Sequence, residues 1–434
     1  MNLGCRLAAS TALLLAGLAV LLNACSDSDP HIETLHFWAM GSEAEVLTQL
    51  LPDFQREHPS IRVEVQQLAW TAAHEKLLTA IAGDATPDLC QLGNTWLPEL
   101  VALHAIEPLQ TRIDASKAVV RDDYFPGVWQ TNMLNGTLYG VPWYVDTRLL
   151  FYRTDLLNAA GFARPADTWA EWLLQMQAIK KLVGPQRYAV LLPLNEFEQL
   201  QILALQQTES MLREGGRYGN FRSASFRRAL GFYRDLYTQS LAPTITATQI
   251  SNVWNELGKG FFAYYVSGPW NIREFKRRLP PEQQGTWMTA PMPGPDGPGV
   301  SNVGGSSLVL FKRSKHQASA WALIEFLSRP SVQQRFHEIT GDLPPRRSSW
   351  ASGEIAHDPY ARAFRTQLER LRAFPQVPEW EQIMQAMRVM AERVVQGQQD
   401  LDSAVIAFDA EVDAMLAKRR WILDRHARTA SSAS

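Results

Sequence analysis

The stretch HIETLHFWAMGSEAEVLTQLLPDF, residues 31–54, decides the fold of the N-terminal part of the chain. Its first nine residues hold apolar side chains in a near-continuous β pattern, which Gly41 interrupts. Ser42 is followed three residues later by Glu45, which matches a capping box, and apolar residues follow at helical spacing as far as Phe54. The stretch therefore predicts a strand that turns into a helix at Gly41 and Ser42.

The next segments repeat this pattern. Apolar side chains alternate over 61–65, helical spacing covers about 71–82, and a third short strand is expected at 88–92. A β-α-β-α-β order is the unit of an open parallel sheet, in which ligands bind beyond the carboxyl ends of the strands. Residues 40–43 and 93–96 are therefore candidate site segments.

The N-terminus predicts export. Residues 1–24 contain one basic residue, Arg6, followed by an apolar run over 7–22. Sixteen residues at ~1.5 Å each span roughly 24 Å, less than the ~30 Å of a bilayer core, which favours a signal peptide over a permanent span. The run ends in LNAC, which resembles a bacterial lipoprotein cleavage box with Cys25 as the lipidation site. We therefore expect a lipid-anchored protein of the periplasm or cell surface; the alternative is an ordinary secretory signal.

Composition narrows the class of protein. A chain of 434 residues with 46% hydrophobic and 20% charged residues is ordinary for two or three globular domains. The formal charge of −2 provides no general attraction for nucleic acid. After cleavage only Cys25 and Cys90 remain, and Cys90 lies in a predicted strand interior, so no disulfide is expected. The 14 tryptophans are the unusual feature.

Signatures of catalysis are missing from the sequence. It contains no Gly-x-Ser-x-Gly elbow, no Walker loop and no Gly-x-Gly-x-x-Gly fingerprint. His74-Glu75 and His337-Glu338 each lack the second histidine of a zincin helix. We therefore expect no catalytic residues, no metal and no cofactor.

Five segments, taken in order, resemble the family 1 solute-binding proteins of ABC importers, the group that includes maltose- and trehalose/maltose-binding proteins. They are FWAMGSE at 37–43, GVPWYVDTRLLFY at 140–152, SGPW at 267–270, GGSS at 304–307 and GDLPPR at 341–346. The resemblance covers nearly the whole mature chain. It implies an α/β, two-lobe periplasmic-binding-protein fold (type II-like), in which each lobe is an open mostly parallel sheet flanked by helices, with a helical C-terminus.

The resemblance also implies how the chain is divided into lobes and which partners it binds. The N-terminal lobe is expected to hold 31–144 plus 291–344, the C-terminal lobe 148–288 plus 348–434, with hinge segments near 145–147, 289–290 and 345–347. Such a protein acts as a monomer, and its partners are a sugar, the ABC importer permease subunits and, through the lipid on Cys25, a membrane.

Site residues follow from the chemistry of sugars, whose ring faces suit aromatic plates and whose rim hydroxyls suit carboxylates and amides. Glu43 is a candidate acceptor, or else a carboxylate that complements the helix dipole. Trp96 is a stacking or rim candidate, with core packing as the alternative. Residues 138–153 are expected to form a long strand, interrupted by Pro142, that crosses between the lobes. In this strand, alternation sends Tyr144 and Asp146 to one face and Trp143 to the other. Asp146 is expected to accept a sugar hydroxyl, unless it only pairs with Arg148.

The second half of the chain adds further candidates. Trp270 follows a Gly-Pro turn and is expected to stack from the second lobe. Gly304 and Gly305 would let the backbone approach the ligand, or form a plain turn. Arg346 would donate to sugar oxygens or hold Asp146. Weaker ligand-binding candidates are Trp70, Asn94, Trp143 and Trp254, with burial favoured for Trp70 and Trp254.

The resulting hypothesis is an exported sugar-binding lipoprotein that captures a di- or oligosaccharide of the maltose/trehalose type between two lobes and delivers it to a permease. One alternative is a polyamine or quaternary amine held through cation–π contacts, which Arg346 would oppose. Another is a lipoprotein glycosidase, which needs two carboxylates ~5–9.5 Å apart. The sequence identifies no such pair, so we expect a binding protein and not an enzyme.

Overall fold

The computed structural model describes residues 32–196 and 198–432, and it opens with the predicted alternation of strands and helices. These elements are β1 (Glu33–Met40), α2 (Gly41–Glu57), β2 (Ile61–Leu68), α3 (Trp70–Ala82) and β3 (Leu89–Gly93). The β-α-β-α-β prediction is confirmed. The predicted signal peptide, residues 1–24, and Cys25 lie outside the described residues. Within the described part, no helix has the length and apolarity needed to cross a membrane.

The predicted capping box is wrong. Helix α2 begins at Gly41, and its N-cap residue Met40 has no side-chain cap. Ser42 lies inside the first turn, where its hydroxyl donates to the carboxylate of Glu43 at 3.3 Å. Glu45 instead accepts a hydrogen bond from Gln67 on β2. The helix thus starts two residues earlier than a Ser42 N-cap requires, at Gly41, whose φ of +56° is a conformation that glycine tolerates.

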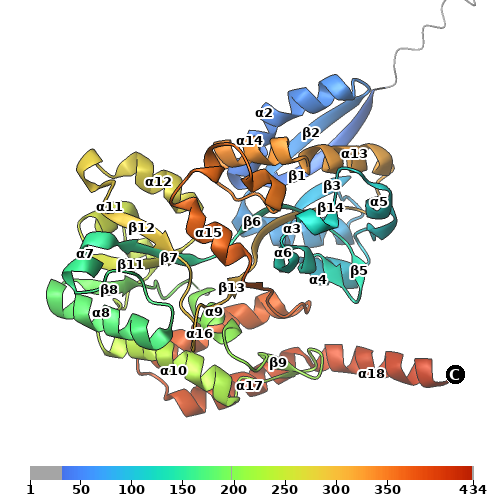
Figure 1. Cartoon of the computed structure of the whole chain (residues 1–434). Coiled ribbons are helices and arrows are strands. Elements are labelled where there is room, and N and C mark those ends of the chain that lie inside the picture. Colours follow the sequence, from blue (N-terminus) through green and yellow to red (C-terminus); the bar gives the residue numbers. More distant parts are fainter. Residues whose placement is uncertain (1–31, 197, 433–434) are drawn as a thin grey trace, which may run out of the picture.

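The first lobe is built on a five-stranded sheet in the order β2-β1-β3-β14-β6. Strands β1, β2 and β3 are parallel, whereas β14 (Gly304–Leu310) runs antiparallel to both β3 and β6 (Val141–Asp146). Helices α13 (Gln317–Leu327) and α14 (Pro330–Thr340) contribute to the same core, and α14 packs against α2. This lobe lies at the upper right of Figure 1.

The second lobe has a four-stranded sheet in the order β12-β7-β11-β8. Its strands are β7 (Leu149–Arg153), β8 (Tyr188–Leu191), β11 (Phe262–Ser267) and β12 (Trp287–Ala290). In this sheet β8 and β11 are parallel, and the pairs β7–β11 and β7–β12 are antiparallel. The two-lobe α/β class with mostly parallel sheets is confirmed, and each sheet contains one reversed strand, β14 in the first sheet and β7 in the second.

The crossing segment is two strands and not one. The sequence predicts a long strand over 138–153 interrupted by Pro142, but Pro142 lies inside β6 and the break falls at Thr147 and Arg148. Strand β6 is at the edge of its sheet, where the missing N–H of proline costs no ladder hydrogen bond. The chain leaves the first sheet at Asp146 and enters the second at Leu149.

Helices cover the second sheet and form the C-terminus, as predicted (Figure 1). Their core contains the fully buried Trp172 and Trp380. Cys90 is buried in β3 and forms no disulfide among the described residues. The larger helices of this part are α8 (Trp169–Val183), α9 (Glu198–Leu205), α10 (Ala224–Thr238), α12 (Trp270–Arg278), α15 (Ala361–Leu368), α16 (Trp380–Val395), α17 (Leu401–Met415) and α18 (Ala417–Ser432).

Short elements complete the two lobes. The short helices are α4 (Leu97–Ala102), α5 (Gln110–Ala115), α6 (Pro126–Gln130), α7 (Thr154–Ala159) and α11 (Val253–Gly258). The short strands are β4 (Met133–Leu134), β5 (Thr137–Leu138), β9 (Leu212–Arg213), β10 (Tyr218–Gly219), β13 (Ser301–Asn302) and β15 (Leu371–Arg372).

Candidate functional site

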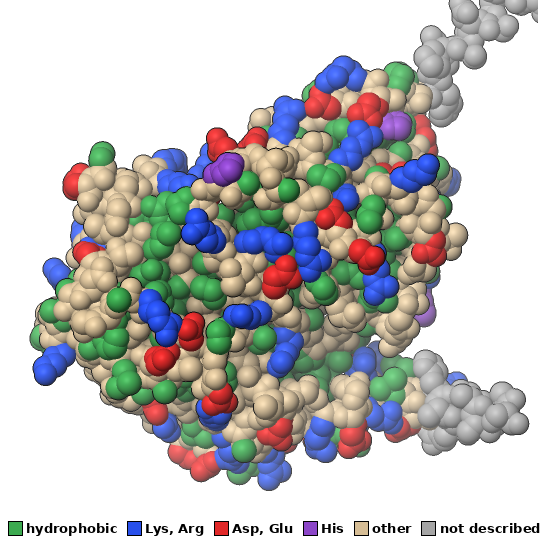
Figure 2. All heavy atoms as spheres, viewed as in Figure 1, with side chains coloured by type: hydrophobic (Ala, Val, Ile, Leu, Met, Phe, Trp, Pro, Cys, Tyr) green, Lys and Arg blue, Asp and Glu red, His purple; other side chains and the backbone are tan. Residues whose placement is uncertain are grey.

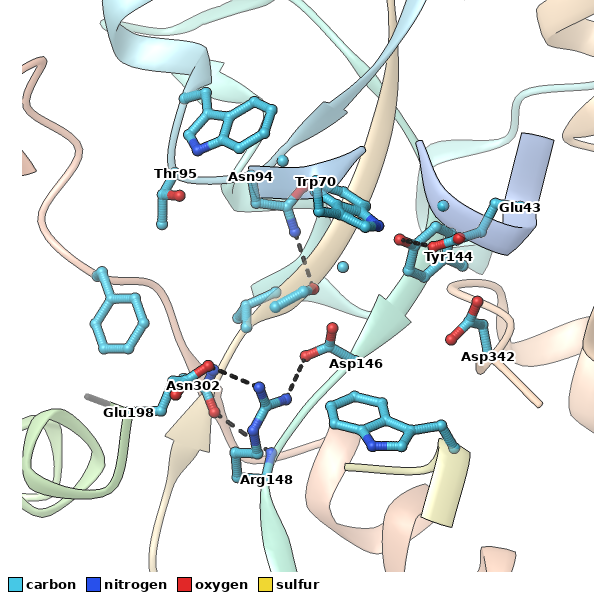
Figure 3. Close-up of a pocket in the computed structure, with 18 of the residues that line it drawn as sticks. Glu43, Trp70, Asn94, Thr95, Tyr144, Asp146, Arg148, Glu198, Asn302 and Asp342 are labelled. Carbon is cyan, nitrogen blue, oxygen red and sulfur yellow. Dashed lines mark hydrogen bonds and ion pairs between the residues drawn. The ribbon is translucent and has the colours of Figure 1, made fainter. Parts of the chain in front are cut away.

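A cavity of about 700 Å³ lies between the two lobes and is lined by residues of both (Figure 3). The first lobe contributes the start of α2 with Glu43, the start of α3 with Trp70, and the loop after β3 with Asn94 and Trp96. These three positions follow the carboxyl ends of β1, β2 and β3, which is where open α/β sheets place their ligands. The topological prediction from residues 40–43 and 93–96 therefore agrees with the structure.

The second lobe closes the other side of this cavity. Trp270 begins α12 directly after β11, and Glu198 begins α9. Phe374, Glu381 and Met384 come from α16 and the loop before it. Glu198, Phe374, Glu381 and Met384 were not predicted, because helix and loop positions far along the chain carry no local signal of a shared cavity.

Tyr144 organises one end of the cavity from β6. Its hydroxyl donates to Glu43 Oε1 at 2.7 Å and accepts from Gln91 Nε2 at 3.1 Å and from Ser306 Oγ at 3.0 Å. Burial, together with the nearby Asp342 and Glu43 carboxylates, raises the pKa of Tyr144 well above its usual value. The phenol therefore stays a donor at neutral pH and fixes the carboxylate of Glu43, whose other oxygen accepts a longer hydrogen bond from Ser42.

Arg148 organises the opposite end. Its guanidinium donates to Asp146 at 3.0 Å and to Glu198 at 2.7 Å (Figure 3). The same guanidinium lies over the ring of Trp270. Burial raises the pKa of Asp146 despite the attraction of Arg148, and the negative charge of Glu198 adds to this effect. Asp146 therefore pairs with Arg148, as the alternative interpretation expected, and it also lines the cavity.

Asp342 is a further acid at the cavity, and it was not among the predicted ligand-binding residues. It follows Gly341, the left-handed residue that ends α14 with a φ of +86°. Burial and the nearby charges of Glu43 and Asp146 raise the pKa of Asp342 well above its usual value. Its carboxyl group therefore takes up a proton at a higher pH than an exposed aspartate does. The quoted segment GDLPPR contained this residue, but the interpretation selected Arg346 instead.

Gly304 and Gly305 line the cavity at the start of β14. A Cβ at position 304 would lie 2.0 Å from Asp146 Oδ1, so only glycine leaves room for that carboxylate. Gly305 has a φ of +96°, and a Cβ there would lie 2.5 Å from the carbonyl oxygen of Tyr144. The two glycines therefore allow β14 to lie close to β6. Contact of their backbone with a ligand stays a prediction.

Two tryptophans of the first lobe form one wall. Trp70 is 37% exposed, and its ring meets that of Trp96 edge-on at 5.7 Å between centroids. The preference for burial of Trp70 is therefore wrong. Trp96 is largely buried and also contacts the His74 ring at 5.1 Å between centroids. The exposed ring of Trp70 therefore lines the cavity, and the more buried ring of Trp96 packs against it.

Arg346 is not at the cavity, which corrects the sequence-based expectation. Its guanidinium donates to Asp123 Oδ2 at 2.6 Å, to the Ala118 carbonyl at 2.7 Å and to the Ser328 carbonyl at 2.6 Å. It is 6% exposed, and its ring contact is Tyr124. These three acceptors belong to the first lobe, and Arg346 is not among the residues that line the cavity.

Trp143 and Trp254 also lie outside the cavity lining. Trp143 is fully buried and packs against Phe336 with 4.7 Å between ring centroids, as its place on the inward face of β6 requires. Trp254 donates from Nε1 to Asn271 at 2.7 Å and carries the Arg278 guanidinium over its ring. Of the twelve ligand-binding candidates, nine line the cavity: Glu43, Trp70, Asn94, Trp96, Tyr144, Asp146, Trp270, Gly304 and Gly305.

In residues 32–196 and 198–432, no group of three or more His, Cys, Asp or Glu side chains is arranged to hold a metal ion. The polar groups at the cavity are acids, amides, hydroxyls and one guanidinium, an arrangement that can donate to and accept from a polar organic ligand.

Two lobes with a cavity at the carboxyl ends of strands define a class, the two-lobe binding proteins. Residues 49–363 match the family of bacterial extracellular solute-binding proteins, and the chain belongs to this family. The fold is similar to that of the sugar-binding protein MalE from Xanthomonas citri, with a TM-score of 0.88 and 58% identity over 90% of this chain and 99% of that one.

Curated relatives are more distant. The diacetylchitobiose binding protein DasA of Streptomyces coelicolor is 23% identical over 388 residues, which cover 85% of this chain and 88% of the relative. An uncharacterized lipoprotein of Streptomyces antibioticus is 26% identical over 402 residues, which cover 85% of each chain.

Proposed function

We propose that this protein is the sugar-binding component of a bacterial ABC importer and that its ligand is a di- or oligosaccharide of the maltose/trehalose type. The observation that carries the proposal is a single cavity lined by aromatic rings from both lobes, Trp70 and Trp270. Three carboxyl groups line the same cavity: Glu43, Asp146 and Asp342. Aromatic rings cover the apolar faces of a sugar, and carboxylates accept from its hydroxyls with ~1.5–3 kcal/mol per charged hydrogen bond.

Cavity size and similarity support this proposal. A volume of about 700 Å³ lies within the ~300–1,000 Å³ of small-molecule sites. The Xanthomonas citri protein, which is named as sugar-binding, shares 58% of its residues with this chain. DasA is named for a disaccharide ligand. A neutral sugar fits a lining in which the acids are partly engaged by Tyr144 and Arg148.

The mechanism follows from the division of the lining between lobes. A sugar held between Trp70 and Trp270 makes all its contacts only when the lobes are close, so binding shifts the population towards the closed state. A shift from 1:99 to 99:1 needs ~5.5 kcal/mol of differential affinity, which a few charged hydrogen bonds and two stacked rings supply. We propose that the first lobe holds residues 31–144 plus 291–344 and the second lobe 148–288 plus 348–434. The proposed hinges lie near 145–147, 289–290 and 345–347. The first hinge is supported by the change from one sheet to the other between Asp146 and Leu149.

Titration calorimetry with maltose, trehalose, sucrose and a maltooligosaccharide tests the ligand class. We expect one of these sugars to bind at one site per chain and Trp270→Ala to weaken it at least tenfold. Trp421→Ala, which removes an exposed indole outside the cavity lining, is the matched control and should bind normally. Absence of heat with every sugar would overturn the proposal.

A cationic ligand is the second candidate, because five carboxylates line the cavity against one guanidinium. The acids are Glu43, Asp146, Glu198, Asp342 and Glu381, and the base is Arg148. Arg346 was expected to repel a cationic ligand from the cavity, but it does not line the cavity, so this objection to a cation no longer applies. The same calorimetry with spermidine and choline decides between the classes, since a cation would lose affinity at high salt and a sugar would not.

We further propose that the protein binds its sugar without chemical change and is a lipid-anchored monomer of the periplasm or cell surface that docks on the permease subunits of its importer. The relatives named as binding proteins and the LNAC segment at 22–25 support this. Incubation with maltose and trehalose should release no glucose. Mass analysis of the mature chain should find a diacylglyceryl group on Cys25, and Cys25→Ser should abolish it.

A further inference from the structure

Helix α18 (Ala417–Ser432) extends beyond the rest of the second lobe at the lower right of Figure 1. Its inner face rests on the β9–β10 hairpin. Arg419 donates to the Gly216 carbonyl at 3.1 Å, and Arg420 donates to the Arg217 carbonyl at 3.0 Å. Asp424 forms an ion pair with Arg217. These contacts fix which side of the helix faces the body.

The opposite side carries a stripe of exposed side chains: Lys418, Trp421, Ile422 and Arg425. Their spacing of i, i+3, i+4 and i+7 places them on one face of the helix. Trp421 is 56% exposed and Ile422 is 36% exposed. The Arg425 guanidinium lies 5.4 Å from the centroid of the Trp421 ring. We call these four residues the outer stripe.

The charge of α18 differs from that of its surroundings. Its sequence contains Lys418 and four arginines against the single acid Asp424, which Arg217 already engages. On the face shown in Figure 2, acidic and basic side chains are interspersed instead. A cationic helix face with an exposed tryptophan is typical of helices that lie at the boundary of an anionic membrane, where cations meet headgroups and indole sits at the interface.

We propose that the outer stripe of α18 docks on an anionic phospholipid surface. The small apolar content of the stripe argues for lipid, because two exposed side chains are far from the ~1,000 Å² that a specific protein interface buries. Lys418 and Arg425 flank Trp421 within two helical turns, so both cations reach headgroups when the indole inserts. This contact would orient the sugar cavity of a tethered protein, but it requires neither a sugar nor the lipid on Cys25.

Flotation with vesicles tests the proposal on the chain from Ser26 onward, which keeps every described residue and lacks the acylation site. Vesicles of phosphatidylcholine with one quarter phosphatidylglycerol should carry the protein upward, pure phosphatidylcholine should not, and added salt should weaken the association. At ~1 kcal/mol for each cation, Lys418→Gln with Arg425→Gln should lower the partition coefficient roughly 30-fold. Trp421→Ala should lower it as well.

The matched control is Lys312→Gln with Lys315→Gln, which removes the same charge from an exposed loop of the first lobe and should leave partitioning unchanged. Equal loss in the two double variants would show a nonspecific charge effect and overturn the proposal, as would failure of the unaltered chain to float with anionic vesicles. Thermal melting and the affinity for sugar should be the same in all variants, so a failure here is distinct from a failure of the sugar-binding proposal.

Discussion

The guanidinium of Arg148 lies over the indole ring of Trp270, with its Cζ carbon 4.7 Å from the ring centroid. The same guanidinium binds Asp146 and Glu198. One residue at the crossing between the sheets therefore positions both an aromatic wall and an acid of the cavity. Because Arg148 follows β6 of the first sheet by two residues, a movement of the crossing segment displaces Trp270 and Asp146 together.

Gly268→Ala is predicted to disturb this wall without unfolding the protein. A Cβ at position 268 would lie 2.2 Å from Cζ3 of Trp270, so the indole must move away from its place over the backbone. We expect about tenfold weaker sugar binding by calorimetry, because stacking is lost while the acids stay. Gly285→Ala is the control, since a Cβ there meets nothing within 4 Å. Unchanged affinity in Gly268→Ala would contradict a stacking role for Trp270.

Arg346→Ala is predicted to lower stability and leave sugar affinity unchanged. The guanidinium is buried and pairs with Asp123, and removal of one partner of such a pair costs ~3–5 kcal/mol of unfolding free energy. Urea unfolding measures this loss. Arg335→Ala breaks an exposed pair with Asp53 and should cost at most ~1 kcal/mol. Weaker sugar binding by folded Arg346→Ala would restore the original prediction of a ligand role.

The same pair gives a pH dependence. Burial alone would raise the pKa of Asp123, but hydrogen bonds from Ser348 and Arg346 lower it below its usual value. A lowered pKa in the folded state contributes stability above the ordinary aspartate pKa, and this contribution is lost as the pH falls through the lowered value. The stability difference between the unaltered chain and Arg346→Ala should therefore shrink in acid and be largest at neutral pH.

Sequence patterns were sufficient for the residues whose neighbours are local. Glu43 and Trp96 follow strands directly, and the alternation along β6 correctly separated Tyr144 and Asp146 from Trp143. These inferences rest on the periods of strands and helices and on where a parallel sheet ends, both of which are readable along the chain.

The remaining lining residues depend on distant contacts. Asp342 and Arg346 stand four residues apart in one quoted segment, yet the first faces the cavity and the second turns into the first lobe to meet Asp123. Asp123 lies more than 200 residues earlier, so no local pattern distinguishes these directions. Glu381 and Met384 likewise reach the cavity only through the packing of α16 on the second lobe.

Asp342→Asn is predicted to stabilise the folded protein at neutral pH. Burial and the charges of Glu43 and Asp146 raise the pKa of Asp342, so its ionised form is disfavoured in the folded state. This penalty is present when the pH exceeds the raised pKa and is relieved as the pH falls towards the usual aspartate value. Urea unfolding should therefore show a gain for Asp342→Asn at pH 8 that vanishes in acid. Glu75→Gln, which removes an exposed acid outside the cavity lining, is the control.

Three side-chain hydrogen bonds at the edge of the cavity join the lobes, and their removal is predicted to open the sugar-free protein. Thr95, after β3, donates its hydroxyl to Glu381 on α16, and Gln376 donates from Nε2 to the Thr131 carbonyl at 2.9 Å and to the Gln130 carbonyl at 3.3 Å. Thr95→Val with Gln376→Ala removes these bonds without changing an aromatic residue of the cavity. We expect a larger radius of gyration by small-angle scattering without sugar and a several-fold weaker affinity, because the competent closed state is less populated. Gln398→Ala, on an exposed turn, should change neither quantity. A radius that stays the same in the double variant would mean that these bonds do not hold the lobes together.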